Sequence, residues 1–318
     1  MNIIFTGTSA FAVPSLEAVI AAAQHDILAV ITQPDKPKGR GREMQMSPVK
    51  EVALAHGIPV MQPEKIASPE SVAQIKDYGP IGSMVVVAYG QKISTELLEW
   101  PKYGVVNVHG SILPKYRGAA PIQYAIMMGE GQTGVTTMLM DEGWDTGDIL
   151  LQESLDILPD EDAEQLAGRL ALLGAGLLVR TLDGLETGTV GPIPQDEELA
   201  TEAHSLARDA GVIDWSRGAS DIVNLVRGVS PRPGAFTRVN GTQVKVWKAA
   251  AEQLDSDAGQ AGEIVEVGKD GVIVAAGSGT VRLVEVQPES RGRMSASDFA
   301  RGAKLSKGDH MDVRFDMP

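Results

Sequence analysis

The sequence predicts a two-domain protein, in which an α/β domain with a mostly parallel sheet is followed by a smaller domain of short β strands. In the first half, short β-rich runs alternate with helical patterns, which is typical of βαβ units. After residue 203 the β runs are closely spaced and separated by Gly-rich turns, which favours a small barrel or sandwich. The length of 318 residues is sufficient for two domains with separate cores.

The first domain begins with five short apolar runs that we expect to be strands: Asn2–Gly7, Ile27–Thr32, Pro59–Gln62, Ser83–Tyr89 and Val105–His109. Helices are expected between them. Pro14 and Pro48 suit the first turn of a helix, where the missing N–H is not needed, and Ser47 can cap the second helix. Gly57 is expected to end that helix, because glycine readily adopts the left-handed conformation found there.

Two further strands, Gly134–Met140 and Asp148–Leu155, are expected on either side of the loop 141–147. A long helix should follow, because apolar residues recur with helical spacing at positions 166, 170, 173 and 177.

These elements place the first domain at 1–189, a linker at 190–203 and the second domain at 204–318. The second domain should contain a helix near Asp221–Val229. Its expected strands are Ala235–Val239, Val244–Lys248, Ala261–Val267, Gly271–Ala276 and Val281–Val286.

The net charge of −14 is concentrated in one region. Residues 141–210 contain 17 acidic and three basic residues, whereas the rest of the chain contains 25 of each. This acidic stretch is interpreted as a solvated helix and linker. The overall charge therefore does not exclude a polyanionic partner, because binding is steered by local patches.

Other patterns narrow the function classes. The chain has no cysteine, which excludes disulfides, thiolate zinc sites and a cysteine nucleophile, and its five histidines are too scattered to predict a metal site. A GxGxxG loop, a Walker loop and a GxSxG elbow are all missing from the sequence. Without a long apolar run or a secretory leader, we expect a cytoplasmic protein with no membrane partner.

Asn107 and His109 end a predicted buried strand, so their side chains should emerge on the same face near a ligand crevice. Asp145 lies in another loop of the same sheet. An amide and an imidazolium can donate hydrogen bonds to an oxyanion, while a carboxylate stabilises the charged imidazole and relays protons. The three together favour acyl-type transfer to an amine, although each alone is also compatible with a structural residue.

The connection at 33–44 is unusually long and carries four cations, Lys36, Lys38, Arg40 and Arg42. We expect a glycine-containing loop that is either simply solvated or a phosphate-binding element. Both interpretations are open from composition alone.

Several blocks together resemble the folate-dependent formyltransferases, and within them the bacterial methionyl-tRNA formyltransferases. The blocks begin at Ile3 (IIFTGT), Gln33 (QPDKPKGRG), Val85 (VVVAYG), Asn107 (NVHGSILP), Arg117 (RGAAPIQ), Met140 (MDEGWDTGD) and Val244 (VKVWKA). The similarity extends essentially from end to end, and the block from Asn107 to Gln123 is highly specific for formyl transfer.

The resemblance implies a Rossmann-like N-terminal domain that uses 10-formyltetrahydrofolate as co-substrate, without a metal, and an OB-like C-terminal barrel that helps to bind tRNA. It implies formyl transfer to the α-amino group of methionyl-initiator tRNA, and we expect a monomer. The implied catalytic residues are Asn107, His109 and Asp145. The implied folate-binding segment is Ser111, Ile112, Leu113 and Pro114. The implied tRNA contacts are Lys36, Lys38, Arg40 and Arg42, of which Arg40 matches the most important arginine.

Three positions differ from the family pattern. Ile112 replaces a leucine, a change that roughly conserves volume. Trp144 stands where leucine is common, and it either lines the folate site or packs, of which we favour packing. Arg232 lies in a Pro-Arg-Pro-Gly turn, where either a phosphate contact or an ordinary surface position is possible.

Two alternatives differ in substrate or in class. A formyltransferase acting on a nucleotide sugar or another small amine would share Asn107, His109 and Asp145 but would not need the basic loop and the barrel. A non-catalytic tRNA- or folate-binding module would not need the catalytic constellation.

Overall fold

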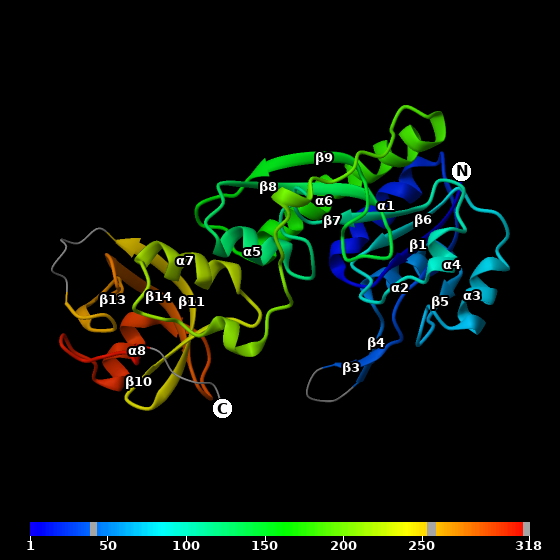
Figure 1. Ribbon diagram of the computed structural model, residues 1–318. Coiled ribbons are helices and arrows are strands. Elements are labelled where there is room, and N and C mark those ends of the chain that lie inside the picture. Colours follow the sequence, from blue (N-terminus) through cyan, green and yellow to red (C-terminus); the bar gives the residue numbers. More distant parts are fainter. Residues whose placement is uncertain (39–42, 253–258, 314–318) are drawn as a thin grey trace. The chain divides into compact units, whose positions relative to one another are not determined.

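The computed structural model describes residues 1–38, 43–252 and 259–313 (Figure 1). Its contacts divide the chain into two compact units, each with its own core. The first unit contains Met1–Pro121, Thr133–Leu155 and Ala167–Ala203, and the second contains Ile122–Gln132, Asp156–Leu166 and His204–Pro318. We propose domains at 1–189 and 204–318, joined by a linker at 190–203.

The first unit contains a seven-stranded sheet in the order β5-β2-β1-β6-β7-β8-β9. Its strands are β1 (Asn2–Gly7), β2 (Asp26–Ile31), β5 (Val60–Met61), β6 (Ser83–Val87), β7 (Val105–His109), β8 (Gln132–Leu139) and β9 (Ile149–Asp156). The pairs from β5 to β7 are parallel, whereas β7 and β8 are antiparallel. This confirms the mostly parallel sheet. All five residues of β6 are buried, as expected for a central parallel strand.

Helices connect and cover these strands: α1 (Val13–Ala22), α2 (Pro48–Ala55), α3 (Pro69–Lys76), α4 (Thr95–Leu98) and α6 (Ala163–Thr187). The predicted boundaries of α2 are confirmed. The Ser47 side chain accepts a hydrogen bond from the Lys50 amide, and Gly57 follows the helix with a φ of 67°.

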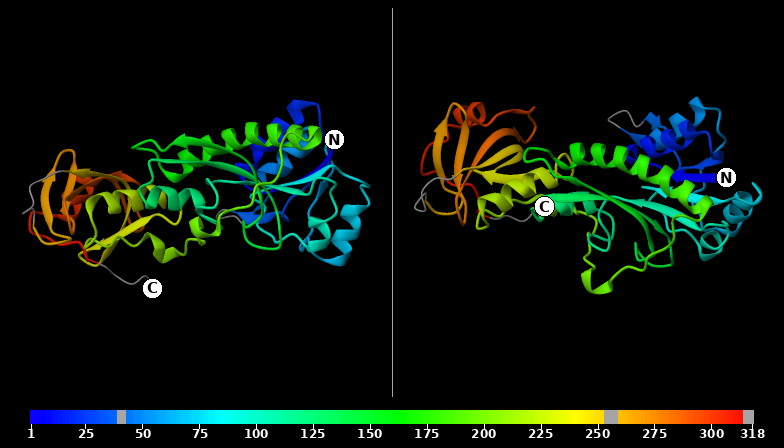
Figure 2. Two further views of the ribbon diagram at one scale, coloured as in Figure 1. Left: turned by 45° about the horizontal axis from the view of Figure 1, so that its top comes forward. Right: turned by 90° about the horizontal axis from the view of Figure 1, so that it is seen from above.

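The long helix α6 packs closely on the sheet behind the strand that carries the predicted catalytic residues (Figure 2). A Cβ at Gly174 would lie 3.0 Å from a methyl of Val108 and 3.2 Å from one of Val135. By length and composition α6 could also cross a membrane, but half of its most apolar window is buried inside the protein. It therefore has the character of a core helix.

The basic connection was predicted to be a loop, and this prediction is wrong in part. The connection contains a two-stranded antiparallel ribbon of β3 (Lys36–Lys38) and β4 (Glu43–Gln45). The two strands pair at three positions, and the ribbon projects from the first unit (Figure 1). Arg40 and Arg42 lie outside the described residues.

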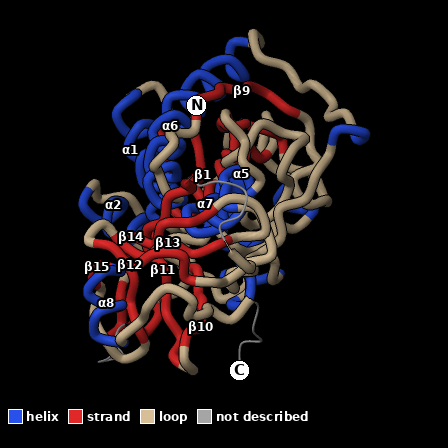
Figure 3. Tube along the Cα trace, turned by 90° about the vertical axis from the view of Figure 1, so that its left-hand side faces the viewer, coloured by secondary structure: helices blue, strands red, loops and turns tan. Residues whose placement is uncertain are grey.

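The second unit contains an antiparallel sheet in the order β10-β11-β14-β13-β12, with β15 paired to β14 (Figure 3). The strands are β10 (Ala235–Val239), β11 (Thr242–Glu252), β12 (Ile264–Gly268), β13 (Gly271–Ala275), β14 (Thr280–Pro288) and β15 (Met294–Ser295). The unit also contains the helices α5 (Pro121–Met127), α7 (Ala219–Gly228) and α8 (Ala296–Ala303).

The segment 308–312 connects the two edges of this sheet. The Asp312 amide donates to the Arg238 carbonyl in β10, and the Met311 amide donates to the Gly262 carbonyl before β12. The edge strands are thus closed into a small barrel, in agreement with the expected OB-like domain. Its core combines residues of the strands with α7 and α8, and its largest fully buried side chain is Trp215.

Candidate active site

Asn107 and His109 lie at the carboxyl end of β7, two residues apart on one strand. Asn107 pairs in register with Val86 of β6, and its Nδ2 donates to the Val86 carbonyl over 3.1 Å. The other carboxamide atom, Oδ1, is buried and has no hydrogen-bond partner among the described residues. An unpartnered buried acceptor in a polar strand end is suited to a ligand donor.

His109 is buried between two acceptors. Its Nε2 lies 2.9 Å from the Tyr116 carbonyl, and its Nδ1 lies 3.6 Å from Asp145 Oδ2. Because a carbonyl oxygen can only accept, Nε2 must carry a proton. The distance from Nδ1 to the carboxylate permits charge interaction but is too long for a good hydrogen bond, so Nδ1 remains available to a substrate.

Asp145 lies in the loop between β8 and β9, and its side chain is brought to His109 from a separate segment. The Gly118 amide donates to Asp145 Oδ2 over 2.8 Å. The predicted convergence of imidazole and carboxylate is therefore present, and Gly118, which the sequence did not identify, contributes to it.

Three non-glycine residues around these strand ends have left-handed backbones: Ala88 (φ 45°), Tyr116 (φ 62°) and Asp145 (φ 57°). Such conformations cost on the order of 1–3 kcal/mol each and persist where the surroundings fix them. Ala88 follows β6, Tyr116 follows β7 and Asp145 follows β8. β8 runs antiparallel to β7, so the Asp145 loop reaches the carboxyl end of β7 by folding back, and the left-handed backbone at Asp145 is part of that return.

The segment Ser111–Pro114 is a turn whose backbone is already hydrogen-bonded within the protein. The Thr136 hydroxyl donates to the Ser111 carbonyl and accepts from the Leu113 amide, and Gln152 donates to the Leu113 carbonyl. Ser111 and Leu113 are buried, whereas Ile112 and Pro114 are partly exposed. Direct ligand contact is therefore more readily made by Ile112 and Pro114, with Ser111 and Leu113 as support.

The root of the basic ribbon is fixed by a polar cluster. Lys50 Nζ lies 2.6 Å from Asp35, and Gln62 donates to the same carboxylate over 2.7 Å. These hydrogen bonds lower the pKa of Asp35. Lys36 Nζ donates to Gln33 Oε1 over 2.7 Å, while Lys38 is placed only through its backbone pairing with Glu43.

Trp144 does not pack, contrary to prediction. Its side chain is 73% exposed, because it precedes Asp145 in a loop whose turn is closed by Asp141 rather than by apolar contacts. The tryptophan therefore contributes surface rather than core.

Arg232 belongs to a basic cluster on the second unit. Lys245 Nζ and Arg293 Cζ lie 3.8 Å and 3.3 Å from the ring centroid of Trp247. Burial lowers the pKa of Lys245, and the charges of Arg293 and Arg232 lower it further. In the part of the chain that the structure describes, none of the three cations has a carboxylate partner. This basic cluster (Arg232, Lys245, Trp247 and Arg293) is suited to phosphate.

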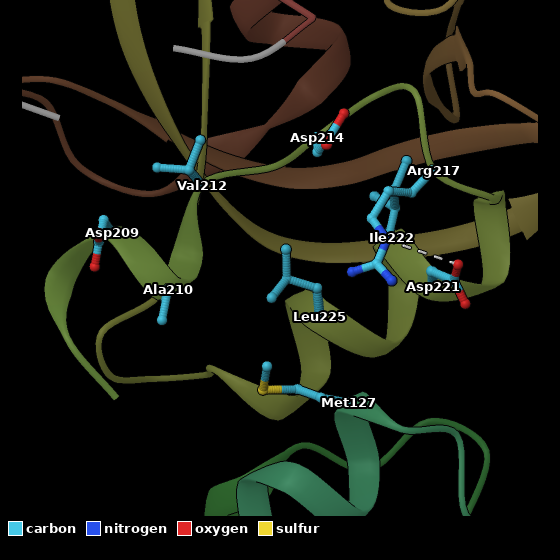
Figure 4. Close-up of a pocket in the computed structure, with 9 residues that line it drawn as sticks. All are labelled: Met127, Asp209, Ala210, Val212, Asp214, Arg217, Asp221, Ile222 and Leu225. Carbon is cyan, nitrogen blue, oxygen red and sulfur yellow. Dashed lines mark ion pairs between the residues drawn. The ribbon is translucent and has the colours of Figure 1, made fainter. Parts of the chain in front are cut away.

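The second unit also has a pocket of about 360 Å³, shown in Figure 4. Apolar side chains at its centre are surrounded by acidic residues and one arginine, and the lining is Met127, Asp209, Ala210, Val212, Asp214, Arg217, Asp221, Ile222 and Leu225. It contains none of the predicted site residues. Among the described residues, no group of three or more acidic or histidine side chains could hold a metal ion.

The sequence also did not identify Gln195 and Arg117 as parts of the site around His109 and Asp145. Gln195 donates to the carbonyls of Asp145 and Gly147, and its Oε1 accepts from Arg117. Gln195 falls in the predicted linker, where composition indicated no structure. The only available signal was the specific Arg-Gly-Ala-Ala-Pro block, which begins at Arg117.

Comparison with known proteins shows the family to which the chain belongs. Residues 1–182 match the family described as Formyl transferase, and residues 205–304 match Formyl transferase, C-terminal domain. A methionyl-tRNA formyltransferase of Geobacter metallireducens is 48% identical over 308 residues, which cover 97% of each chain. The fold and these matches define a group-transfer enzyme. The chain belongs to the formyl transferase family, which confirms the resemblance found in its sequence blocks.

Two solved structures share the fold at low sequence identity. WlaRD, a sugar 3N-formyl transferase studied with dTDP and 5-N-formyl-THF, matches with a TM-score of 0.66 and 18% identity over 92% of this chain and 99% of that chain. HypX from Aquifex aeolicus in complex with tetrahydrofolic acid matches with a TM-score of 0.62 and 17% identity over 94% of this chain. The match spans 46% of HypX, so this chain corresponds to about half of that protein.

Proposed function

We propose that this enzyme transfers the formyl group of 10-formyltetrahydrofolate to the α-amino group of methionyl-initiator tRNA. The full-length similarity to a methionyl-tRNA formyltransferase supports the amine substrate. The folate compounds present with WlaRD and in complex with HypX support the co-substrate class. The contact between His109 and Asp145 at a strand end is the single structural observation that carries the mechanism.

The residues at the site are compatible with a folate co-substrate, which would supply an activated formyl group. The buried, unpartnered Oδ1 of Asn107 leaves an acceptor for a ligand donor. Ile112 and Pro114 offer partly exposed apolar surface beside the supported turn. We propose that Ser111, Ile112, Leu113 and Pro114 form this part of the folate site. Ile112 and Pro114 would contact the ligand, and Ser111 and Leu113 would hold the shape of the turn.

Asn107 and His109 are proposed to stabilise the formyl oxygen as it gains negative charge. One Nδ2 hydrogen of Asn107 binds the Val86 carbonyl, which leaves the second for this oxygen. Since Nε2 of His109 is bound to the Tyr116 carbonyl, Nδ1 is the nitrogen that donates to the formyl oxygen. Preorganised donors of this kind act most strongly in a site with little water.

Asp145 is proposed to hold His109 in its charged form and to assist proton transfer through water. During the reaction the attacking amine loses one proton and the departing folate nitrogen gains one. Asp145 Oδ2 is bound to Gly118, so its other oxygen is the acceptor for the relaying water. An aminoacyl ester withdraws electrons from its amine, which therefore needs no strong base near pH 7.

For tRNA binding we propose two elements. The basic ribbon would contact the acceptor end through Lys36, Lys38, Arg40 and Arg42. The basic cluster of the second unit would contact phosphates, as befits a tRNA-binding barrel. We further propose that the protein acts as a monomer in the cytoplasm.

The test is a formylation assay with the purified protein, 10-formyltetrahydrofolate and methionyl-initiator tRNA, read as the mass increase of the aminoacyl-tRNA. We expect rapid formylation by the wild type. His109→Ala should slow single turnover by about 100–1,000-fold, because one preorganised donor is lost. His56→Ala, a change at the exposed end of α2, provides a matched control and should leave the rate unchanged.

Other outcomes separate the alternatives. Formylation of a nucleotide-sugar amine but not of methionyl-tRNA would identify the small-amine enzyme. Binding of tRNA or folate without turnover would identify a non-catalytic module. An unchanged single-turnover rate in His109→Ala would remove the proposed role of the imidazole.

A further inference from the structure

Gln195 links the loop 141–147, which carries Asp145, to a second segment of the first unit. Its Nε2 donates to the carbonyls of Asp145 and Gly147 over 2.8 and 2.7 Å. Because Asp145 has a strained left-handed backbone, bonds to its own carbonyl and to a neighbouring one help to fix where its carboxylate points.

The orientation of the Gln195 amide is determined by Arg117. The Oε1 atom of Gln195 accepts from Nε and Nη2 of Arg117 over 3.0 and 2.9 Å. A guanidinium can only donate and a carbonyl can only accept, so the amide oxygen must face Arg117 and the amide nitrogen must face the Asp145 loop.

Arg117 is in turn fixed by Glu197. Its guanidinium is 9% exposed and forms a bidentate pair with the Glu197 carboxylate at 2.8 and 2.7 Å. The Arg117 hydrogen bond lowers the pKa of Glu197. The pair is therefore charged at neutral pH and is lost only as the pH falls through this lowered value.

The backbone around Arg117 contacts both members of the catalytic pair. The Tyr116 carbonyl accepts from His109, and the Gly118 amide donates to Asp145. The Arg117 amide also donates to the Thr201 carbonyl, and the Ala203 amide donates to the Arg117 carbonyl. Residues 201–203 therefore lie alongside residues 116–118. The predicted linker is thus bonded to the catalytic loops.

We propose that Gln195, oriented by Arg117 and Glu197, is a positioning residue for formyl transfer that acts through Asp145. The proposal rests on the proposed catalytic role of the His109–Asp145 pair. Its prediction is specific: removal of the Gln195 amide should lower the rate of the chemical step while leaving substrate binding intact.

The test compares Gln195→Leu and Gln195→Glu with the wild type in steady-state formylation, with single-turnover rates to isolate the chemical step. Both variants lose the two donors to the loop, while the glutamate keeps an acceptor for Arg117. We expect kcat to fall by about 10–100-fold, since a shift of about 1 Å at a reacting group has effects of this size. KM for both substrates should change little. Gln74→Leu, at an exposed position of α3, is the matched control.

A double-mutant cycle distinguishes positioning from a general structural effect. If Gln195 acts through Asp145, Gln195→Leu should change the rate of an Asp145→Asn enzyme by less than about 2-fold, because the two effects are not independent. Glu197→Gln should lower kcat moderately, whereas Glu198→Gln, the same change at the next residue, should not. Independent effects in the cycle, or an unchanged kcat in both Gln195 variants, would overturn the proposal.

The cycle also separates this proposal from the proposed function. If Asp145→Asn itself retains wild-type turnover, the catalytic pair is wrong. If Asp145→Asn is impaired and the Gln195 variants are not, only the positioning role is wrong.

Discussion

Trp144 and Asp145 are neighbours in one loop but have opposite environments. The Trp144 side chain is exposed, while Asp145 is held by Gly118 and Gln195 and contacts His109. A left-handed φ at Asp145 turns its carboxylate toward the strand end. Asp145 is therefore restrained by polar contacts, and the aromatic residue beside it is not.

Trp144→Leu should change the free energy of unfolding by no more than about 0.5 kcal/mol, because an exposed side chain away from caps and networks contributes little. The measurement is urea denaturation of both proteins under the same conditions. A matched comparison is Trp215→Leu, which removes a fully buried ring whose Nε1 donates to Thr237 and should destabilise strongly. A large loss in Trp144→Leu would show that this ring packs after all.

At the scale of elements, Ser47 joins the basic ribbon to α2. Its hydroxyl accepts from the Lys50 amide at the helix start and lies 2.8 Å from the buried Thr32 hydroxyl at the end of β2. One side chain thus caps a helix and ties it to the strand that precedes the ribbon.

Ser47→Ala should lower the free energy of unfolding by about 1–2 kcal/mol, at the upper end for a helix cap because a second hydrogen bond is also lost. Ser94→Ala is the matched control. Ser94 precedes α4 in the same position, but its hydroxyl makes no capping bond and has no partner among the described residues. Equal losses from the two substitutions in urea denaturation would contradict the assigned role of Ser47.

The sequence predicted the elements whose signals are local. The parallel strands, the cap at Ser47 and the end of α2 at Gly57 are confirmed because apolar runs and cap chemistry act within a few residues. The β3–β4 ribbon was missed, since its polar, proline-containing strands lack alternating hydrophobicity.

The candidate site was predictable to a similar extent. The contact between His109 and Asp145 was expected because both residues lie at a strand end or loop of one sheet and match the family pattern. The contribution of Gln195 was not predictable, because it depends on hydrogen bonds to residues 50 and 78 positions away in the chain. Its neighbours have linker composition, which carries no information about such partners.

At the scale of the whole molecule, the net charge of −14 does not oppose binding to tRNA, because the acidic residues are concentrated in 141–210. In the basic cluster of the second unit, Lys245 and Arg293 lie over the ring of Trp247, and the charge of Arg232 acts on Lys245. Mutual repulsion among these cations is relieved when a phosphate binds, which favours a polyanion at this face.

If this cluster contacts tRNA, replacing both Arg232 and Arg293 with glutamine should weaken binding and make it less dependent on salt. The slope of log affinity against log salt should decrease in magnitude by about 2, or close to 1 for each lost phosphate contact. Lys269→Gln, an exposed change in the turn between β12 and β13, removes charge elsewhere on the same unit and should leave the slope unchanged. Affinities are measured by fluorescence anisotropy over a range of salt concentrations. A slope equal to that of the wild type in the double variant would refute phosphate contact at this cluster, whereas a parallel decrease in Lys269→Gln would indicate a diffuse effect of net charge.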